Sequence, residues 1–154
     1  MKQLKLPPYS YRLKESSGGK QIFDPVRRRY VALTPEEWVR QHFINYLAEV
    51  LKYPKGLIRV EASFRLNKML RRADILVCDR KGEPVMIVEC KAPEVNLTRQ
   101  VFEQIFNYNL SFGVRYLVVT NGLVHFSGVA DTERHRFILL DHIPDYESVN
   151  SQTL

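Results

Sequence analysis

Three charged side chains, Asp74, Glu89 and Lys91, stand at the ends of two neighbouring apolar runs of the sequence. Glu89 and Lys91 close the run from residue 84 to residue 93, and they share one face because side chains alternate across a strand. A short turn joins the two runs, so a hairpin would bring Asp74 close to Glu89. Two converging carboxylates repel each other unless a cation lies between them. The pattern therefore favours a hard divalent ion, with Mg²⁺ as the first choice.

Such a site could hydrolyse a phosphate ester. Mg²⁺ binds through one or two protein carboxylates and keeps several waters, one of which can attack phosphorus. Lys91 could orient that water or help to deprotonate it, and the backbone carbonyl of Cys90 is an additional candidate ligand. The ordinary alternative for a lone Glu-x-Lys pair is a structural ion pair between Glu89 and Lys91. Asp74, one strand earlier, shifts the interpretation toward catalysis.

The hydrophobic pattern predicts the elements that position these residues. Thr34, Pro35 and Glu37 form a capping box at the start of a helix that is expected to reach about residue 52. The other predicted elements are strands at 57–64, 72–79 and in the run 84–93, a helix capped by Asn96 to about residue 112, and strands at 115–120, 123–126 and 136–140. This order predicts an α/β fold with a mixed β-sheet flanked by helices.

Length and composition bound the class of protein. The 154 residues, 45% apolar and 26% charged, fit one domain, expected over residues 21–154 after an N-terminal arm or loop at 1–20. No apolar run approaches the ~20 residues of a membrane span, and the N-terminus lacks a signal-peptide core, so we expect a cytoplasmic protein with no membrane partner. Cys78 and Cys90 lack the spacing of a zinc site and are interpreted as buried free thiols. Gly-rich nucleotide-binding motifs and a nucleophile elbow are absent.

The positive charge is concentrated in the first half of the chain. Residues 1–77 carry 16 Lys and Arg against 7 Asp and Glu, whereas residues 78–154 carry 7 against 10. Dense basic clusters lie at Arg27, Arg28 and Arg29 and at Arg65, Lys68, Arg71 and Arg72. Such clusters attract a polyanion without reading its sequence, although a solvated basic face is the alternative.

Four motifs in order resemble one known family. They are Leu-Thr-Pro-Glu-Glu-Trp-Val-Arg-Gln at 33–41, Ala-Asp-Ile-Leu at 73–76, Val-Glu-Cys-Lys-Ala-Pro at 88–93 and Gln-Ile-Phe-Asn-Tyr-Asn at 104–109. Asp74 with Glu89-Cys90-Lys91 resembles the split acid and Glu-x-Lys signature of the PD-(D/E)XK nucleases. Together, the motifs resemble the N-terminal nuclease domain of type I restriction enzyme R subunits, from about residue 23 to residue 140. The resemblance implies a restriction-endonuclease-like fold with an α-β-β-β-α-β core.

The resemblance also implies an activity and roles for single residues. It implies an Mg²⁺-dependent deoxyribonuclease of endonuclease type, working in restriction-modification or DNA processing, with Mn²⁺ as a substitute metal. Asp74 and Glu89 would be metal ligands, and Lys91 would be the lysine near the attacking water. An acid on the first helix would approach the metal or a bound water. Glu37 is favoured for this role and as a further metal ligand, although its capping role explains it without any catalysis and Glu36 is nearly as good a candidate.

A second set of residues is expected to touch nucleic acid. Gln104 and Tyr108, one helical turn apart, match the Gln-x-x-x-Tyr pattern of RecB-like nucleases, which supports the site and contacts the nucleic acid. The alternative is an interfacial helix face with a satisfied tyrosine hydroxyl. The full predicted set is Gln104, Tyr108, Arg71, Arg72 and Arg40.

The chain differs from type I R subunits in one respect, since those carry a helicase motor and a subunit-binding region, and this sequence ends at Leu154. We therefore expect a stand-alone nuclease domain that binds DNA, with a protein partner that supplies motor or specificity. A homodimer is a further candidate, because one active site cuts one strand. The alternative function is a non-catalytic nucleic-acid or protein-binding module on the same fold. A structural interaction protein, whose strand-end charges form ion pairs, is a third and weaker interpretation.

Overall fold

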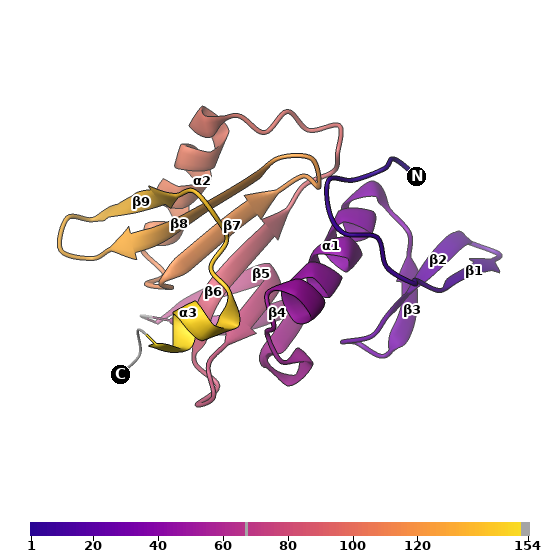
Figure 1. Cartoon of the computed structure of the whole chain (residues 1–154), viewed down its shortest axis with the longest axis horizontal. Helices are drawn as coiled ribbons and strands as arrows, with labels where there is room; N and C mark the ends of the chain where they lie inside the picture. The colour runs from indigo at the N-terminus through magenta and orange to yellow at the C-terminus, as the bar shows by residue number, and fades with distance from the viewer. Residues whose placement is uncertain (67, 152–154) are drawn as a thin grey trace.

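The computed structural model describes residues 1–66 and 68–151, which fold into two β-sheets and several helices (Figure 1). The N-terminal sheet has the strand order β1 (Leu13–Ser16), β2 (Gly19–Asp24), β3 (Arg29–Ala32). The larger sheet has the order β4 (Ile58–Leu66), β5 (Met69–Cys78), β6 (Pro84–Cys90), β7 (Tyr116–Thr120), β8 (His125–Asp131), β9 (Arg136–Leu140). The α-helices are α1 (Pro35–Asn45), α2 (Arg99–Leu110) and α3 (Tyr146–Ser151).

The larger sheet is mixed. Strands β6 and β7 are parallel, and all other neighbours are antiparallel. Helix α2 makes the crossover between the two parallel strands, which need such a long connection. The predicted α/β class and the order helix, three strands, helix, strand are therefore confirmed.

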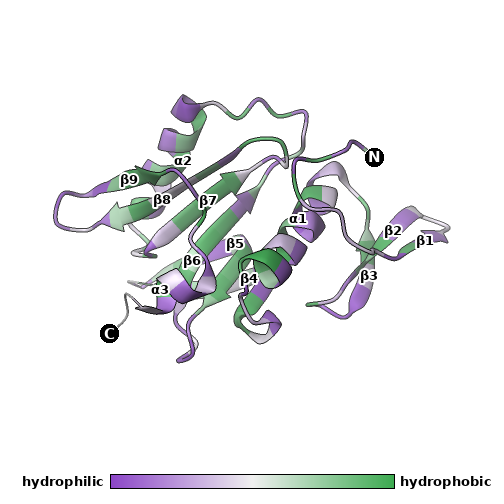
Figure 2. Ribbon diagram, in the orientation of Figure 1, coloured by the Kyte–Doolittle hydropathy of each residue, from purple (hydrophilic) through white to green (hydrophobic). Residues whose placement is uncertain are grey.

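Helices α1 and α2 cover opposite faces of the larger sheet. Met86 and Val88 of β6 belong to one core cluster with α1 and α3, whereas Ile87 packs with Phe102 and Phe106 of α2. This alternation is what a strand buried on both faces requires. The central strands are accordingly the most continuously hydrophobic part of the ribbon (Figure 2).

The alternation between the two faces reverses in the middle of β4. Val60 packs against the core on the α1 side, whereas Ala62 and Phe64 pack against the core on the α2 side. Glu61, between them, has a φ of 49°. A non-glycine residue with positive φ in a strand marks a local irregularity, which here turns the strand over.

The same reversal occurs on the partner strand β5. Ile75 belongs to the core on the α1 side, and Ala73 belongs to the core on the α2 side. Asp74 lies between these two residues and stays half-exposed. The irregularity therefore places a carboxylate at a point of the sheet where strict alternation would have placed a core residue.

Two expectations about the first third of the chain were wrong. Residues 13–16 form strand β1 and β2 begins at Gly19, so the predicted loop at 1–20 contains part of a sheet. The first helix was expected to be α-helical to about residue 52, but α1 ends at Asn45 and a π-helix follows over Tyr46–Val50. There the Leu51 amide donates to the Tyr46 carbonyl, five residues earlier.

Two later boundaries also differ. Thr98 rather than Asn96 caps α2, because its hydroxyl accepts a hydrogen bond from the Val101 amide at 3.2 Å. Strand β8 begins at His125 and extends beyond the predicted 123–126. Cys78 and Cys90 are buried and free, as predicted. Within the described residues, no helix is long and apolar enough to cross a membrane.

Candidate active site

Asp74 and Glu89 occupy neighbouring positions on β5 and β6. The antiparallel ladder between the two strands ends at the pair of Ile75 and Val88, and Asp74 and Glu89 are the next residues beyond this pair. The Cys90 amide donates a hydrogen bond to Asp74 Oδ2 at 2.8 Å. The hairpin thus brings together the two acids that the sequence analysis proposed as metal ligands.

Glu89 is paired with Arg71, a residue of β5. Both side chains are largely buried, with 15% of Glu89 and 12% of Arg71 exposed. Helix α2 fixes the arginine, because Asn109 Oδ1 accepts a hydrogen bond from Arg71 Nε at 3.2 Å. The guanidinium also lies 5.8 Å from the ring centroid of Tyr108 and 5.6 Å from that of Phe112. Arg71 therefore connects the strand-end acid to α2.

Asp74 is the more open of the two acids. Its side chain is 34% exposed, and its nearest cation is Arg40 of α1, with 3.8 Å between Arg40 Nη1 and Asp74 Oδ1. Arg40 itself is held more tightly by Glu37, with 2.7 Å between Arg40 Nε and Glu37 Oε2. The Asp74 carboxylate thus keeps accepting capacity that faces solvent.

Glu37 is buried in a network of hydrogen bonds rather than open to a ligand. Its carboxylate accepts from Arg27 at 2.7 Å, from Arg40 at 2.7 and 2.8 Å and from the Gln41 amide at 3.2 Å. Burial by itself would raise the pKa of Glu37, but the hydrogen bonds and charges of Arg40 and Arg27 outweigh it and hold that pKa below its ordinary value. Glu36, one residue earlier, is exposed.

The network extends to both sheets. Arg27 also binds Asp24 at the end of β2, with both carboxylate oxygens engaged. Glu61, at the irregularity of β4, pairs with Arg27, with Arg40 and with Arg72 at 3.1–3.3 Å. These contacts tie the small sheet and α1 to the edge of the larger sheet, next to Asp74.

Lys91 directly follows β6, and its amide donates to the Thr120 carbonyl at 2.8 Å. Its side chain is half-buried, and within residues 1–66 and 68–151 its ammonium forms no ion pair or hydrogen bond.

The Cys90 thiol is buried, and burial raises its pKa well above the usual range and keeps it neutral. A neutral thiol is a poor ligand for a hard cation, which leaves the predicted backbone carbonyl as the relevant atom of Cys90.

The residues predicted to touch nucleic acid differ in their surroundings. Tyr108 is 65% exposed and Gln104 is exposed, so the face of α2 that carries both is open to solvent. Arg72 is 66% exposed on its side chain, whereas Arg40 is buried within the Glu37 network. Arg71 contacts both Glu89 and Tyr108, whereas no hydrogen bond joins Gln104 to these residues within the described part of the chain.

The family model of the type I restriction enzyme R protein N terminus (HSDR_N) matches residues 35–144, from the start of α1 to beyond β9. The chain belongs to this family. No curated protein matches the sequence. The matched range leaves out the N-terminal sheet at residues 13–32.

A solved structure supports the fold of this HSDR_N member. It is a fragment assigned to an HsdR subunit of a type I restriction enzyme from Vibrio vulnificus YJ016, with a TM-score of 0.54 and 20% sequence identity. The similarity covers 80% of this chain, which spans 26% of the length of that chain. At this identity, the likeness shows a shared fold and carries no residue roles.

The donor set of this HSDR_N chain fits a hard cation through two carboxylates. Within the described residues, no three His, Cys, Asp or Glu side chains gather as a metal site. Asp74 and Glu89 remain as a pair on adjacent strands, and Mg²⁺ commonly uses one or two carboxylates and keeps its other ligands as water. Because Arg71 already neutralises Glu89, a metal ion would have to take its place.

Sequence reasoning missed three residues that shape the site. Arg27 and Glu61 complete the network around Glu37, and Asn109 holds Arg71. Asn109 could have been noticed, because it falls on the buried face of α2 with Phe102 and Phe106. Arg27 and Glu61 carry no such signal, since they stand in a basic cluster and on the polar side of an alternating strand.

Proposed function

We propose that this chain is a metal-dependent deoxyribonuclease domain that hydrolyses phosphodiester bonds in DNA. The carrying observation is that Asp74 and Glu89 lie next to the last pair of the β5–β6 ladder, with the unpaired Lys91 just beyond, in a member of the R-subunit N-terminal family. Two carboxylates with the free Lys91 ammonium nearby favour hydrolysis over a structural Glu89–Lys91 ion pair, because Glu89 already has Arg71 as its counter-ion.

The proposed metal ligands are the carboxylates of Asp74 and Glu89 and the backbone carbonyl of Cys90. When bound, Mg²⁺, or Mn²⁺ in its place, would supply an activated water and neutralise charge on the phosphate oxygens. The Cys90 amide orients Asp74 through its hydrogen bond to Oδ2. Lys91 Nζ would donate a hydrogen bond to the attacking water and stabilise the negative charge that develops on it.

The acid of α1 that approaches the metal or a bound water must have a free carboxylate, and the two candidates are Glu36 and Glu37. All acceptor positions of Glu37 face arginine or glutamine donors, which supports a structural role for it. Glu36 is exposed, and its side chain forms no hydrogen bond or ion pair within the described part of the chain, so it can accept a hydrogen bond from bound water. We therefore propose Glu36 ahead of Glu37 for this position.

DNA would cross the open face beside the acids. The exposed side chains of Arg72 and Tyr108 would contact it, together with Gln104, one turn earlier on α2. The longer Vibrio vulnificus relative supports a partner, or further domains, that supply motor or specificity functions. A second copy of the chain is proposed for cleavage of both strands.

Cleavage assays test the nuclease proposal. The purified chain is incubated with supercoiled and linear DNA in Mg²⁺, in Mn²⁺ and in EDTA, and products are resolved on gels. We expect metal-dependent cleavage that Asp74→Asn reduces by at least ~100-fold, because the amide still accepts from the Cys90 amide but loses its charge. Glu94→Gln, an exposed acid close to the site in sequence, is the matched control. Absence of cleavage in every metal, or full activity in Asp74→Asn, refutes the proposal.

A non-catalytic DNA-binding module on the same fold is the second candidate. One observation favours it: both strand-end acids already have arginine neighbours, Glu89 with Arg71 and Asp74 with Arg40. This candidate predicts salt-sensitive DNA affinity that is unchanged in Asp74→Ala, and no heat of Mg²⁺ binding by calorimetry. Metal binding that disappears in Asp74→Ala would exclude it.

A further inference from the structure

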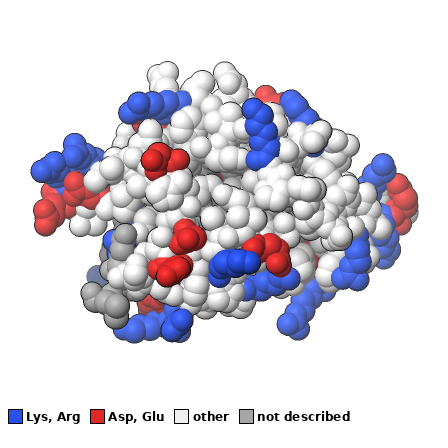
Figure 3. All heavy atoms as spheres, in the orientation of Figure 1, with Lys and Arg blue, Asp and Glu red and all other residues white. Residues whose placement is uncertain are grey.

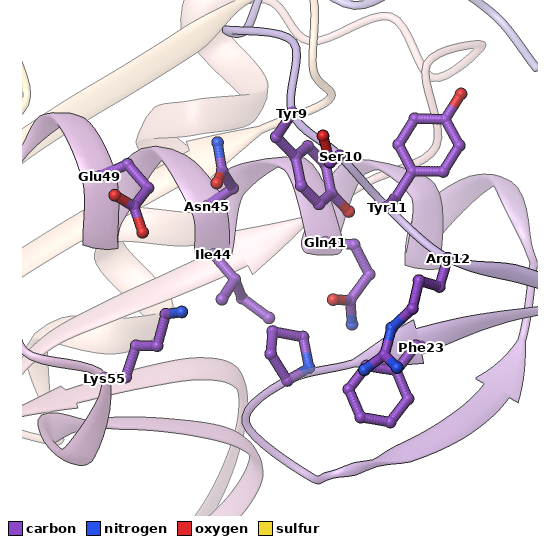
Figure 4. A pocket seen from close by; sticks show the side chains of 11 residues that line it. Tyr9, Ser10, Tyr11, Arg12, Phe23, Gln41, Ile44, Asn45, Glu49 and Lys55 are labelled. Atoms are coloured by element: carbon purple, nitrogen blue, oxygen red, sulfur yellow. The ribbon is translucent and has the colours of Figure 1, made fainter.

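A cavity lies between the N-terminal segment, α1, and β2 with the turn that follows it (Figure 4). It has a volume of about 290 Å³. The residues that line it are Tyr9, Ser10, Tyr11, Arg12, Phe23, Pro25, Gln41, Ile44, Asn45, Glu49 and Lys55. Neither Asp74, Glu89 nor Lys91 is among them, so this cavity is separate from the candidate active site.

Two buried polar atoms in this lining have no hydrogen-bond partner within the described residues: Gln41 Oε1 and the Tyr9 hydroxyl. Gln41 is 1% exposed. Its amide nitrogen donates to Glu37 Oε2, and because a carboxylate only accepts, this bond fixes which end of the amide is nitrogen. The oxygen is therefore the end of the amide that lacks a partner. Buried polar groups are rarely left unpaired, so the pair indicates a ligand that brings both a donor and an acceptor.

The rest of the lining suits a flat aromatic ligand. Tyr9, Tyr11 and Phe23 contribute rings, and the Arg12 guanidinium lies 3.8 Å from the centroid of Phe23. Rings and a guanidinium plane, with a few polar atoms at the edge, are how proteins hold an unstacked base. The volume is near the lower limit of ordinary ligand pockets, roughly 300 Å³, so it favours one such ring system over an extended peptide.

The surface around the cavity favours a ligand attached to phosphates. Exposed cationic residues on or next to the N-terminal sheet are Arg12, Lys14, Lys20, Arg28 and Arg29. Over residues 12–29, Glu15 is the one exposed carboxylate, because Asp24 is buried against Arg27. Lys and Arg side chains accordingly gather at the end of the molecule that carries this sheet (Figure 3).

We propose that this cavity binds a single unpaired base of a DNA strand, with Gln41 Oε1 accepting from the base edge and the Tyr9 hydroxyl paired to the neighbouring edge atom. The basic N-terminal sheet holds the adjoining phosphates. The inference rests on the DNA-binding part of the proposed function, and it adds a site for the base to a sheet that lies outside the residues matched by the family.

The test compares the affinity for a DNA strand that has bases with the affinity for a strand that lacks them. Affinity of the 154-residue chain is measured by fluorescence anisotropy, in EDTA and at fixed salt, for a short single-stranded oligonucleotide and for the same backbone with abasic sites. Stacking predicts roughly 5- to 150-fold tighter binding of the strand that has bases. Equal affinity for both strands means that the backbone alone is bound and the hollow is merely hydrated, which overturns the inference.

Tyr9→Phe makes the test specific for the cavity. The change removes an atom that has no partner in the protein, so folding is unaffected, and we expect about 3- to 10-fold weaker binding of the strand with bases. Affinity for the abasic strand should not change. Tyr30→Phe, the same change on β3 outside the lining, is the matched control. Equal losses in both tyrosine variants, or none in Tyr9→Phe, overturn the assignment.

Two further arms separate the sources of failure. A deoxynucleoside monophosphate that binds as tightly as the oligonucleotide overturns the assignment to a DNA strand and makes the cavity a site for a free nucleotide. EDTA excludes metal-dependent cleavage from the binding assay. Tighter binding of the strand with bases, without nuclease activity, therefore supports the base site and refutes only the hydrolysis. Cleavage activity with equal binding of the two strands refutes the base site and supports the hydrolysis.

Discussion

The carboxylate of Glu37 and the carboxylates of Asp74 and Glu89 lie in one region of the fold but differ in how many donors hold them. Glu37, with 5% of its side chain exposed, accepts from two arginines and an amide. Glu89 has Arg71 as its counter-ion, and Asp74 has a backbone amide and an arginine at 3.8 Å. The three carboxylates therefore carry the same charge but differ in the number of hydrogen bonds and ion pairs that they already form.

The number of partners decides how readily a carboxylate can exchange one of them for a metal ion. A carboxylate with every acceptor position engaged can take a new ligand only by breaking bonds among buried ions, which is costly. A carboxylate with one or two partners and access to solvent can exchange one of them for a metal ion. The α1 network thus joins the small sheet and helix to the edge of the larger sheet, whereas the strand-end acids have fewer partners. Four experiments test this contrast.

The largest effect is expected from Glu37→Gln. The substitution leaves the guanidinium groups of Arg27 and Arg40, 13% and 10% exposed, without a full counter-charge. Breaking a buried pair in this way costs about 3–5 kcal/mol, measured as the free energy of unfolding in urea. Glu103→Gln is the control, because Glu103 forms an exposed pair with Arg99 on α2 and its loss should cost less than about 1 kcal/mol. Equal losses in the two variants would contradict a structural role for Glu37.

Lys91→Ala should act on catalysis and leave stability nearly unchanged. The Lys91 ammonium has no partner within the described residues, so no buried group is left unpaired when it is removed. We expect the rate of DNA cleavage to fall at least ~100-fold, with the urea midpoint unaltered. Lys81→Ala, in the exposed turn between β5 and β6, controls for the lost charge. Cleavage that is equally fast in Lys91→Ala would remove the lysine from the mechanism.

Arg71→Met should tighten metal binding. If Arg71 is the resident counter-ion of Glu89, its removal frees the carboxylate, and the Kd for Mn²⁺ measured by calorimetry should fall about 10-fold. Asn109→Ala, which removes the acceptor that holds Arg71 Nε, should change the Kd in the same direction by less. A weaker Kd in Arg71→Met would mean that the arginine supports the site rather than competing for it.

The sequence predicted most of this sheet, because its signals are local. The apolar runs of β6 and β7 and the N-cap at Thr34 each depend on neighbouring residues, and the structure has them where expected. The reciprocal half of the predicted capping box is absent, because the Thr34 amide donates to the Ala32 carbonyl and the Glu37 carboxylate accepts from arginines and Gln41. The antiparallel hairpin of β5 and β6 also followed from alternation and a short turn.

The network around Glu37 could not be predicted, because it depends on pairs distant in sequence. Arg27 and Glu61 are 34 residues apart, and their contact requires the reversal of β4 at Glu61. A positive φ in the middle of a strand leaves no mark in an Arg-Val-Glu-Ala-Ser pattern that reads as regular alternation. Strand β1 was missed for a related reason, since all four of its residues are exposed and no hydrophobic period marks it.

The smallest effect, and the last, is the pH dependence that the network predicts. For Asp24 and Glu37, burial opposes ionisation, but hydrogen bonds and charge from Arg27, and for Glu37 also from Arg40, lower the pKa of each in the folded state. A lowered folded pKa contributes stability above the ordinary carboxyl range of about 4, and this contribution is lost as the pH falls through the folded value. Urea unfolding at pH 7, 5 and 3 should therefore show falling stability toward pH 3, and the drop should be smaller in Glu37→Gln. Because the groups are buried, 0.5 M NaCl should leave the trend in place. Identical pH profiles for the variant and the unmodified chain would contradict the assignment.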